Sequence, residues 1–123
     1  MDGVEQRQYP RFGLGVPVTL VFSARGVSAD GELQDISRGG CFFKSTIKVD
    51  IHHKISVVFS SDRGQTWRAS GSVIRTVAYR GFAVLFEEGT EPLDEVLQEL
   101  ARQPQESRAA FLTTILNPKI EIL

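Results

Sequence analysis

The sequence predicts an all-β protein, an antiparallel barrel or sandwich followed by one or two helices. Two observations carry this prediction. Six short segments rich in β-branched and aromatic residues recur at intervals of about 8–15 residues, with turn residues between them. After residue 86, the apolar residues stop alternating and recur three and four positions apart, which indicates a helix. The length of 123 residues leaves room for one domain.

The predicted strands are bounded by glycine, proline and polar residues, which favour turns. They cover residues 16–23, 27–36, 41–44, 55–60, 67–77 and 82–86. In the second strand, Asp30-Gly31 is expected to form a bulge or a bend. Before the first strand, Pro10, Gly13 and Gly15 argue against a helix. We therefore expect residues 1–15 to form an N-terminal arm.

The helix that follows the strands is predicted from one apolar stripe and its flanking signals. Thr90 is a candidate N-cap, and Pro104 should end the helix. The stripe consists of apolar residues at helical spacing: Leu93, Val96, Leu97, Leu100 and Ala101. We expect it to pack on the barrel, so residues 16–103 are predicted to form the barrel with its first helix.

Residues 104–123 are predicted to form an extension with a second helix and a short strand. The second helix has its own apolar stripe, formed by Phe111, Leu112, Ile115 and Leu116. Residues 119–123 alternate like a strand. Because a small barrel has little surface left for this stripe, residues 105–123 are expected to form a homodimer or to bind a partner. The alternative is a second helix that folds back on the same barrel.

Composition and charge exclude several classes of protein. The chain is 41% hydrophobic and 24% charged, which is ordinary for a globular domain. No apolar run approaches the roughly 18–20 residues of a membrane span, and the start is unlike a signal peptide. The single cysteine, Cys41, excludes an internal disulfide and fits a reducing compartment, so a cytoplasmic location is expected.

The net charge of −1 conceals an asymmetry along the chain. Residues 1–86 contain 11 lysines and arginines against 7 acidic residues, whereas residues 87–123 contain 3 against 8. A basic body of this kind suits an anionic ligand. The alternative is that the acidic residues lie on the solvated face of a helix.

Two short motifs carry the functional signal. Arg7 and Arg11 form R-x-x-x-R in the predicted arm, and guanidinium groups match phosphate oxygens and the O6/N7 edge of guanine. Asp35, Ser37 and Gly40 form D-x-S-x-x-G at a strand end. Asp35 and Ser37, two positions apart on a strand, should face the same side, where the carboxylate can accept from guanine N1–H and N2–H₂. The alternative readings are a solvated basic arm and an ordinary Asp/Ser turn.

The two motifs in this order, in an all-β context, resemble the PilZ domain family. The resemblance covers roughly residues 6–102 and includes Pro17-Val18 and the segments 71–75 and 81–86. It implies a six-stranded antiparallel β-barrel with a C-terminal helix. It also implies a non-catalytic receptor for the bacterial second messenger cyclic di-GMP, acting on a downstream protein in motility, exopolysaccharide synthesis or surface attachment.

Carried over to this sequence, the resemblance makes Arg7 and Arg11 the arm that wraps the ligand. It makes Asp35 and Ser37 the barrel partners of a guanine, with Gly40 keeping the surface open. Residues flanking these motifs, namely Gln6, Arg38 and Gly39, are secondary candidates. In the family, the residue before the first arginine influences whether one or two ligand molecules bind; here that residue is Gln6. No cofactor is implied.

The remaining alternatives rest on weaker patterns. The chain could be a PilZ-like adaptor that has lost ligand binding, or a small-barrel nucleic-acid binder that stacks bases on Phe42 and Phe43. Strand alternation would bury one of these rings, and nucleic acid is the less favoured partner. The adjacent His52 and His53 would face opposite sides of a strand, which argues against a shared metal. A triad of Ser37, His53 and Asp35 has no supporting nucleophile motif.

Overall fold

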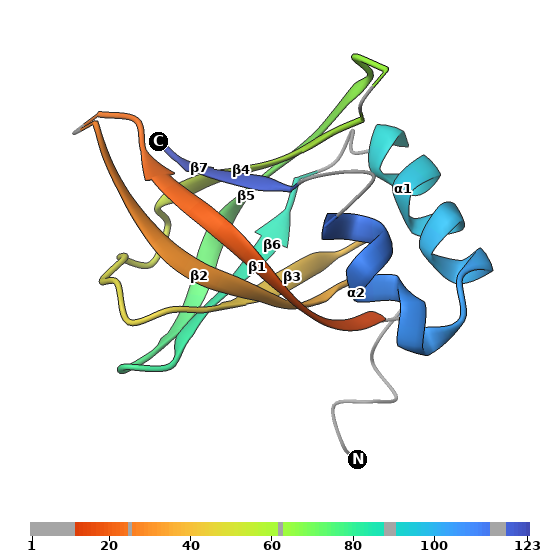
Figure 1. Ribbon diagram of the computed structural model, residues 1–123. Helices are drawn as coiled ribbons and strands as arrows, with labels where there is room; N and C mark the ends of the chain where they lie inside the picture. Colours follow the sequence, from red (N-terminus) through yellow and green to blue (C-terminus); the bar gives the residue numbers. More distant parts are fainter. Residues whose placement is uncertain (1–11, 25, 62, 88–90, 114–117) are drawn as a thin grey trace.

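The computed structural model describes residues 12–24, 26–61, 63–87, 91–113 and 118–123. Strands form a closed barrel with the neighbour order β1-β2-β3-β6-β5-β4-β7 (Figure 1). The strands predicted from the sequence appear as β1 (Phe12–Phe22), β2 (Val27–Ile36), β3 (Gly40–Lys44), β4 (Lys54–Ser60), β5 (Thr66–Val77) and β6 (Gly81–Phe86). The remaining elements are α1 (Glu91–Arg102), η2 (Gln105–Ser107), α2 (Arg108–Phe111) and β7 (Lys119–Ile122). The predicted β-barrel with C-terminal helices is confirmed.

The barrel has seven strands, one more than the resemblance implied. β7 pairs in parallel with β1 and antiparallel with β4, so it closes the gap between the first and fourth strands. All of the remaining strand pairs in the barrel are antiparallel. Closure matters energetically because an unpaired strand edge leaves N–H and C=O groups without partners.

Two local predictions about the first strands are corrected. β1 begins at Phe12, so residues 12–15 belong to the barrel and not to the arm. A β-bulge between Gly13 and Val16, with Gly15 at φ 73°, accommodates these glycines within a strand. In β2, the register continues without interruption through Asp30-Gly31. A Cβ on Gly31 would lie 2.4 Å from a Leu20 methyl group, so this glycine permits close packing across the strands.

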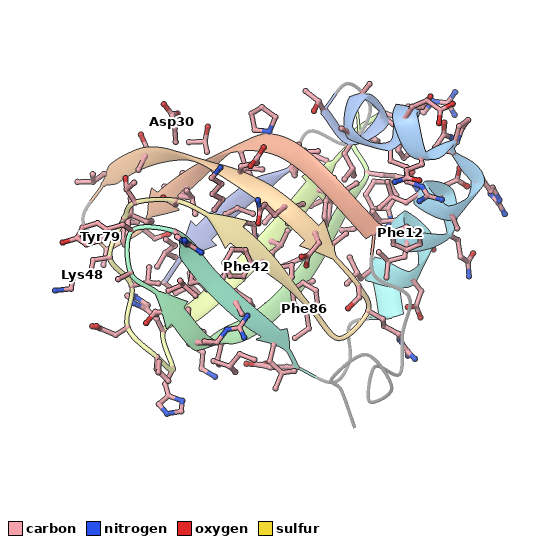
Figure 2. The ribbon with its side chains drawn as sticks, turned by 90° about the horizontal axis from the view of Figure 1, so that it is seen from below. Phe12, Asp30, Phe42, Lys48, Tyr79 and Phe86 are labelled. Carbon is pink, nitrogen blue, oxygen red and sulfur yellow. The ribbon has the colours of Figure 1, made fainter. Side chains whose placement is uncertain are left out.

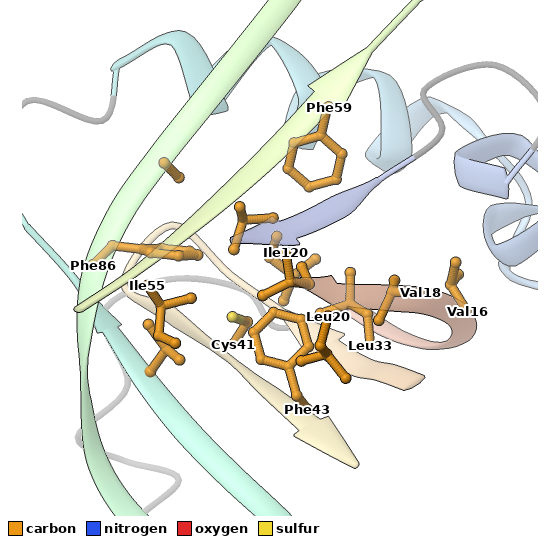
Figure 3. Packing of buried hydrophobic residues seen from close by; sticks show 14 of the residues in the cluster. Val16, Val18, Leu20, Leu33, Cys41, Phe43, Ile55, Phe59, Phe86 and Ile120 are labelled. Atoms are coloured by element: carbon orange, nitrogen blue, oxygen red, sulfur yellow. The ribbon is translucent and has the colours of Figure 1, made fainter. Parts of the chain in front are cut away.

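The interior of the barrel is filled by side chains from all seven strands (Figure 3). Its largest buried aromatic residues are Phe43, Phe59 and Phe82. The rings of Phe43 and Phe82 lie in tilted contact with 5.4 Å between their centres. Alternation along β1 buries Val16, Val18 and Leu20 and exposes the residues between them.

The predicted packing of the first helix is confirmed. Leu93, Val96 and Leu100 of α1 are buried in the barrel's core cluster. The indole Nε1 of Trp67 in β5 donates to Glu95 Oε2 at 2.8 Å, which fixes the outer side of the helix to the sheet. Figure 1 shows α1 and α2 together on one side of the barrel, near the first residues of β1. In the described part of the chain, no helix has the length and apolar character needed to cross a membrane.

The described residues of the extension fold back on the same barrel, as the alternative interpretation expected, although Leu123 is 55% exposed. Three of its apolar residues are at most 1% exposed: Leu112, Ile120 and Ile122. Both edges of β7 are paired within this chain, with β1 and with β4, so the strand offers no free edge to a second chain. Ile115 and Leu116 lie outside the described residues.

Candidate functional site

The strand register brings the start of β1 to the end of β2. Phe12 pairs with Ile36, and Gly13 pairs with Asp35. Arg11, the second arginine of R-x-x-x-R, directly precedes Phe12 in the sequence. Gln6, Arg7 and Arg11 themselves lie outside the described residues. The chain therefore enters the barrel beside D-x-S-x-x-G, although the two motifs are separated by about two dozen residues in sequence.

Asp35 owes its orientation to a bulge in β2. The register shifts between Leu33 and Asp35, and both Leu33 and Ile36 are fully buried although they are three positions apart. The shift leaves Asp35 half-buried, directly across from Phe42 of β3. Bulges commonly redirect side chains next to binding sites. The Asp35 carboxylate thus lies on the outer side of the barrel, between the start of β1 and β3.

Ser37 does not share a strand face with Asp35, because β2 ends at Ile36. Ser37 as a whole residue is 6% exposed. The Ser37 hydroxyl lies 3.4 Å from the Gly40 carbonyl oxygen, to which it donates, and accepts from the Gly39 backbone N–H at 3.2 Å. The backbone N–H of Ser37 also donates to the Gly40 carbonyl at 2.8 Å. Ser37 therefore stabilises the turn between β2 and β3 through hydrogen bonds to the backbone of that turn.

Gly40 is required by the backbone of a neighbouring strand. A Cβ at this position would lie 2.2 Å from the carbonyl oxygen of Val84 in β6. Real Cβ atoms do not approach a backbone oxygen so closely, so any other residue would push β3 and β6 apart. The glycine was expected to keep the outer surface open; its geometry shows a packing requirement inside the sheet.

The turn of D-x-S-x-x-G is tied to both β6 and α1. The Gly39 carbonyl accepts from the Phe86 backbone N–H at 2.9 Å. Arg38 Nε lies 3.1 Å from Asp94 Oδ1 of α1, and both side chains are more than one third exposed. An exposed ion pair of this kind contributes about 0–1 kcal/mol to stability. The pair marks where the turn lies next to α1.

The residues that follow the turn alternate between the inside and the outside of the barrel. Cys41 and Phe43 are buried, as the alternation predicted for one of the two phenylalanines. Phe42 is half-buried and pairs with Asp35 on one side and Ala83 on the other. Of these two rings, Phe42 alone is open to the outside of the barrel, which argues against a platform in which Phe42 and Phe43 both stack bases.

A contact from the extension was not foreseen from the sequence. The Arg108 guanidinium of α2 lies over the Phe12 ring, 4.9 Å from its centre, and Arg108 Nε donates to the Leu100 carbonyl of α1 at 2.9 Å. Arg108 thus joins both helices to the first described residue after the arm (Phe12 is labelled in Figure 2). No local pattern marks Arg108, because its partners come from distant parts of the chain.

The alternatives based on histidine are not supported by the contacts. The His53 imidazole Nε2 lies 3.0 Å from the backbone oxygen of Leu123, and the Ser37 hydroxyl is bonded within its own turn. These two side chains are thus engaged separately and do not form a triad with Asp35. Over the residues that the structure describes, no three His, Cys, Asp or Glu side chains are grouped as metal ligands.

A protein-family model matches most of the chain. The sequence model of the PilZ domain matches residues 5–103. This range includes both arginines of the arm, the turn at residues 35–40 and all of α1, and it ends before the extension. No curated protein and no solved structure matches the chain.

Proposed function

Because this chain belongs to the PilZ domain family, a family of cyclic di-GMP receptors and adaptors, we propose that it binds cyclic di-GMP without catalysing a reaction. Binding serves to relay the second messenger to a downstream protein. The chain acts in the bacterial cytoplasm, where this messenger is made and read.

One observation carries the proposal: the pairing of Gly13 with Asp35 at the junction of β1 and β2. Because of this pairing, the chain lies beside Asp35 only two residues after Arg11. A Cβ on Gly13 would meet no atom within 4 Å, so the space beside this junction is open. A ligand resting there is within reach of both sequence motifs.

In the proposed complex, each motif has its own role. Arg7 and Arg11 hold phosphate oxygens and the O6/N7 edges of the guanines, as guanidinium groups do in bidentate contacts. Asp35 accepts from N1–H and N2–H₂ of one guanine. Ser37 and Gly40 hold the turn that supports Asp35, and Phe42 offers its ring to the base from the neighbouring strand.

Ordering of the arm gives the receptor its switch. Fixing an arm residue costs about 1–2 kcal/mol of backbone entropy, and each charge-assisted hydrogen bond to the ligand returns roughly 1.5–3 kcal/mol. Two arginines with several such bonds offset the ordering of a short arm. The surface seen by a partner then differs between the free and bound states.

Calorimetry tests the proposal. At about 100 µM protein, cyclic di-GMP should release heat with an affinity of roughly micromolar or tighter, whereas cyclic di-AMP and GMP should not compete at equal concentration. Arg7→Ala and Arg11→Ala should each weaken binding about tenfold or more, which corresponds to about 1.4 kcal/mol per tenfold.

Arg63→Ala is the matched control, because Arg63 is an exposed arginine in the link between β4 and β5. It should bind the ligand as the unaltered chain does. Absence of heat from the unaltered chain would overturn the proposal, as would normal binding by both arm variants.

A second candidate is an adaptor that works through protein contacts alone. It is favoured by one observation: two side chains of the D-x-S-x-x-G segment already have partners within the protein, Ser37 in its own turn and Arg38 on Asp94. The same calorimetry separates the candidates, because an adaptor of this kind releases no heat with any dinucleotide.

A further inference from the structure

The outer face of the barrel beside Asp35 carries a row of side chains that crosses four strands. Asp35 of β2 pairs with Phe42 of β3. Phe42 pairs in turn with Ala83 of β6, and Ala83 pairs with Arg75 of β5. Residues directly opposite each other in antiparallel strands place their side chains on the same side of the sheet. Asp35 and Arg75 are therefore the two ends of one row.

A bulge in β5 places Arg75 on this face. The register shifts between Val73 and Arg75, so Ile74 is the extra residue. Val73 is fully buried, whereas Ile74 and Arg75 are both exposed. In such a bulge, two residues lie opposite a single residue of the partner strand, which here is Ala83. Arg75 has no ion-pair partner in the part of the chain that the structure describes, so its guanidinium is available to a ligand.

The middle of the row is an apolar surface, the outer platform, formed by Phe42, Ala83 and Leu85. A Cβ on Gly81 would lie 3.0 Å from Phe42 Cε1, so the Phe42 ring extends over β6. Ala83 is small and half-buried, and Leu85, two positions further on the same face of β6, is 54% exposed. Figure 2 shows Phe42 on β3, between β2 and β6. Apolar side chains gathered on one outer face mark a contact site.

The width of the row suits a ligand with two bases. Asp35 and Arg75 lie three strand spacings apart, which is roughly 14 Å at about 4.8 Å per spacing. This width exceeds one purine ring system, so the carboxylate and the guanidinium can serve two different bases. A carboxylate accepts from the N1–H and N2–H₂ edge of guanine, whereas a guanidinium donates to its O6/N7 edge.

We propose that Arg75 is a further guanine-binding residue, which donates to the O6/N7 edge of the ligand's second base while that base lies flat on the outer platform. This role rests on the proposed binding of cyclic di-GMP and extends it, because Asp35 accounts for one base only. The arm arginines are left to the phosphates and to the base held by Asp35. Stacking on an aromatic surface stabilises any base, so the selection for guanine comes from Arg75.

Calorimetry with cyclic di-GMP and with the mixed dinucleotide cyclic GMP–AMP tests this role, since the mixed ligand has adenine in place of one guanine. The unaltered chain should bind cyclic di-GMP roughly tenfold or more tightly than the mixed ligand, because adenine presents an amino donor where guanine presents O6. Arg75→Ala should weaken cyclic di-GMP binding about tenfold and reduce the difference between the two ligands to less than about threefold. Arg63→Ala, which removes the same charge beyond the other end of β5, should alter neither value.

Ala83→Leu tests the position of the second base independently. Ala83 lies on the outer face, so a larger side chain there takes the place of the base between Phe42 and Arg75 without entering the core. The variant should bind cyclic di-GMP about tenfold more weakly, while its midpoint of unfolding in urea stays near that of the unaltered chain. Ala78→Leu, at an exposed alanine in the turn after β5, is the matched control and should bind normally.

Normal cyclic di-GMP binding by Arg75→Ala or by Ala83→Leu would overturn the role of Arg75 and of the outer platform. An equal loss for the two ligands in Arg75→Ala would overturn it too, as would equal binding of both ligands by the unaltered chain. Each of these results leaves the proposed function standing, because the unaltered chain still binds cyclic di-GMP. Absence of heat from the unaltered chain is a separate result, which removes both.

Discussion

At the scale of single residues, Asp35 combines the two properties that a base-selecting carboxylate needs. It is half-buried, so competition from water is reduced, and it lies on the outer side of the barrel beside the start of β1. A neighbouring aromatic side chain, Phe42, comes from the adjacent strand. Guanine offers two donors on one edge to such a group, whereas adenine offers none in the same place.

We therefore predict that Asp35→Ala lowers the affinity for cyclic di-GMP and also reduces the preference for guanine over adenine. A site built around a hydrogen-bonding partner rejects a ligand that leaves that partner unpaired. Calorimetry with cyclic di-GMP and cyclic di-AMP measures both effects. Asp50→Ala, an exposed carboxylate in the loop between β3 and β4, should change neither. An equal loss for the two dinucleotides would make Asp35 a structural residue only.

Two glycines near the site differ in what surrounds them, and they should respond differently to alanine. Gly40→Ala should lower the free energy of unfolding by about 1–3 kcal/mol or more, because the added Cβ would lie 2.2 Å from the Val84 carbonyl oxygen. Gly13→Ala should leave stability nearly unchanged, since nothing lies within 4 Å of its Cβ position. Urea denaturation distinguishes the two. Equal stability of both variants would contradict the observed packing of β3 against β6.

At the scale of elements, β7 contributes both its hydrogen bonds and its buried side chains to the barrel. Ile120 pairs with Leu20 on one side and Val57 on the other and is fully buried. Ile120→Ala should lower the free energy of unfolding by about 2–5 kcal/mol. Lys119→Ala, on the exposed face of the same strand, should change it by less than about 0.5 kcal/mol. Similar values for both, measured by denaturant unfolding, would mean that β7 is not part of the stable barrel.

The elements themselves were largely predictable because their signals are local. Alternation located the first six strands to within a few residues, and the stripe of Leu93, Val96 and Leu100 identified α1 and its buried face. The sequence of β7 also indicated a strand, but not its partners. Pairing between residues about 100 positions apart leaves no mark in either segment alone, so the tail was wrongly assigned to contacts outside the chain.

The candidate site was predictable to a smaller extent. The motif residues Asp35, Ser37 and Gly40 could be chosen from their types and spacing, and the structure places them at one junction of strands. Their individual geometry was not predictable, because it depends on a bulge in β2 and on the approach of β6 to Gly40. Arg7 and Arg11 remain predictions, since both lie outside the described residues.

At the scale of the whole molecule, three apolar side chains of the extension's described residues are buried in the barrel's core, which favours a monomer over a dimer built from this segment. Leu112, Ile120 and Ile122 have no exposed apolar area left for a second copy. The full chain should be a monomer by light scattering. A chain ending at Gln103 should lose stability and self-associate, because the edges of β1 and β4 are then unpaired. A stable dimer of the full chain would contradict this prediction.

The parallel pairing of Thr19 with Lys119 also has a kinetic consequence. Contacts between residues so far apart in sequence form slowly, because a long loop must close before any of them stabilises the chain. During synthesis, the hairpin of β1 and β2 leaves the ribosome long before β7 exists. Until β7 has been synthesised, β1 and β4 each have an unpaired edge, and such edges can pair with strands of other chains. We expect the time spent in that state to influence how readily this protein aggregates during its synthesis.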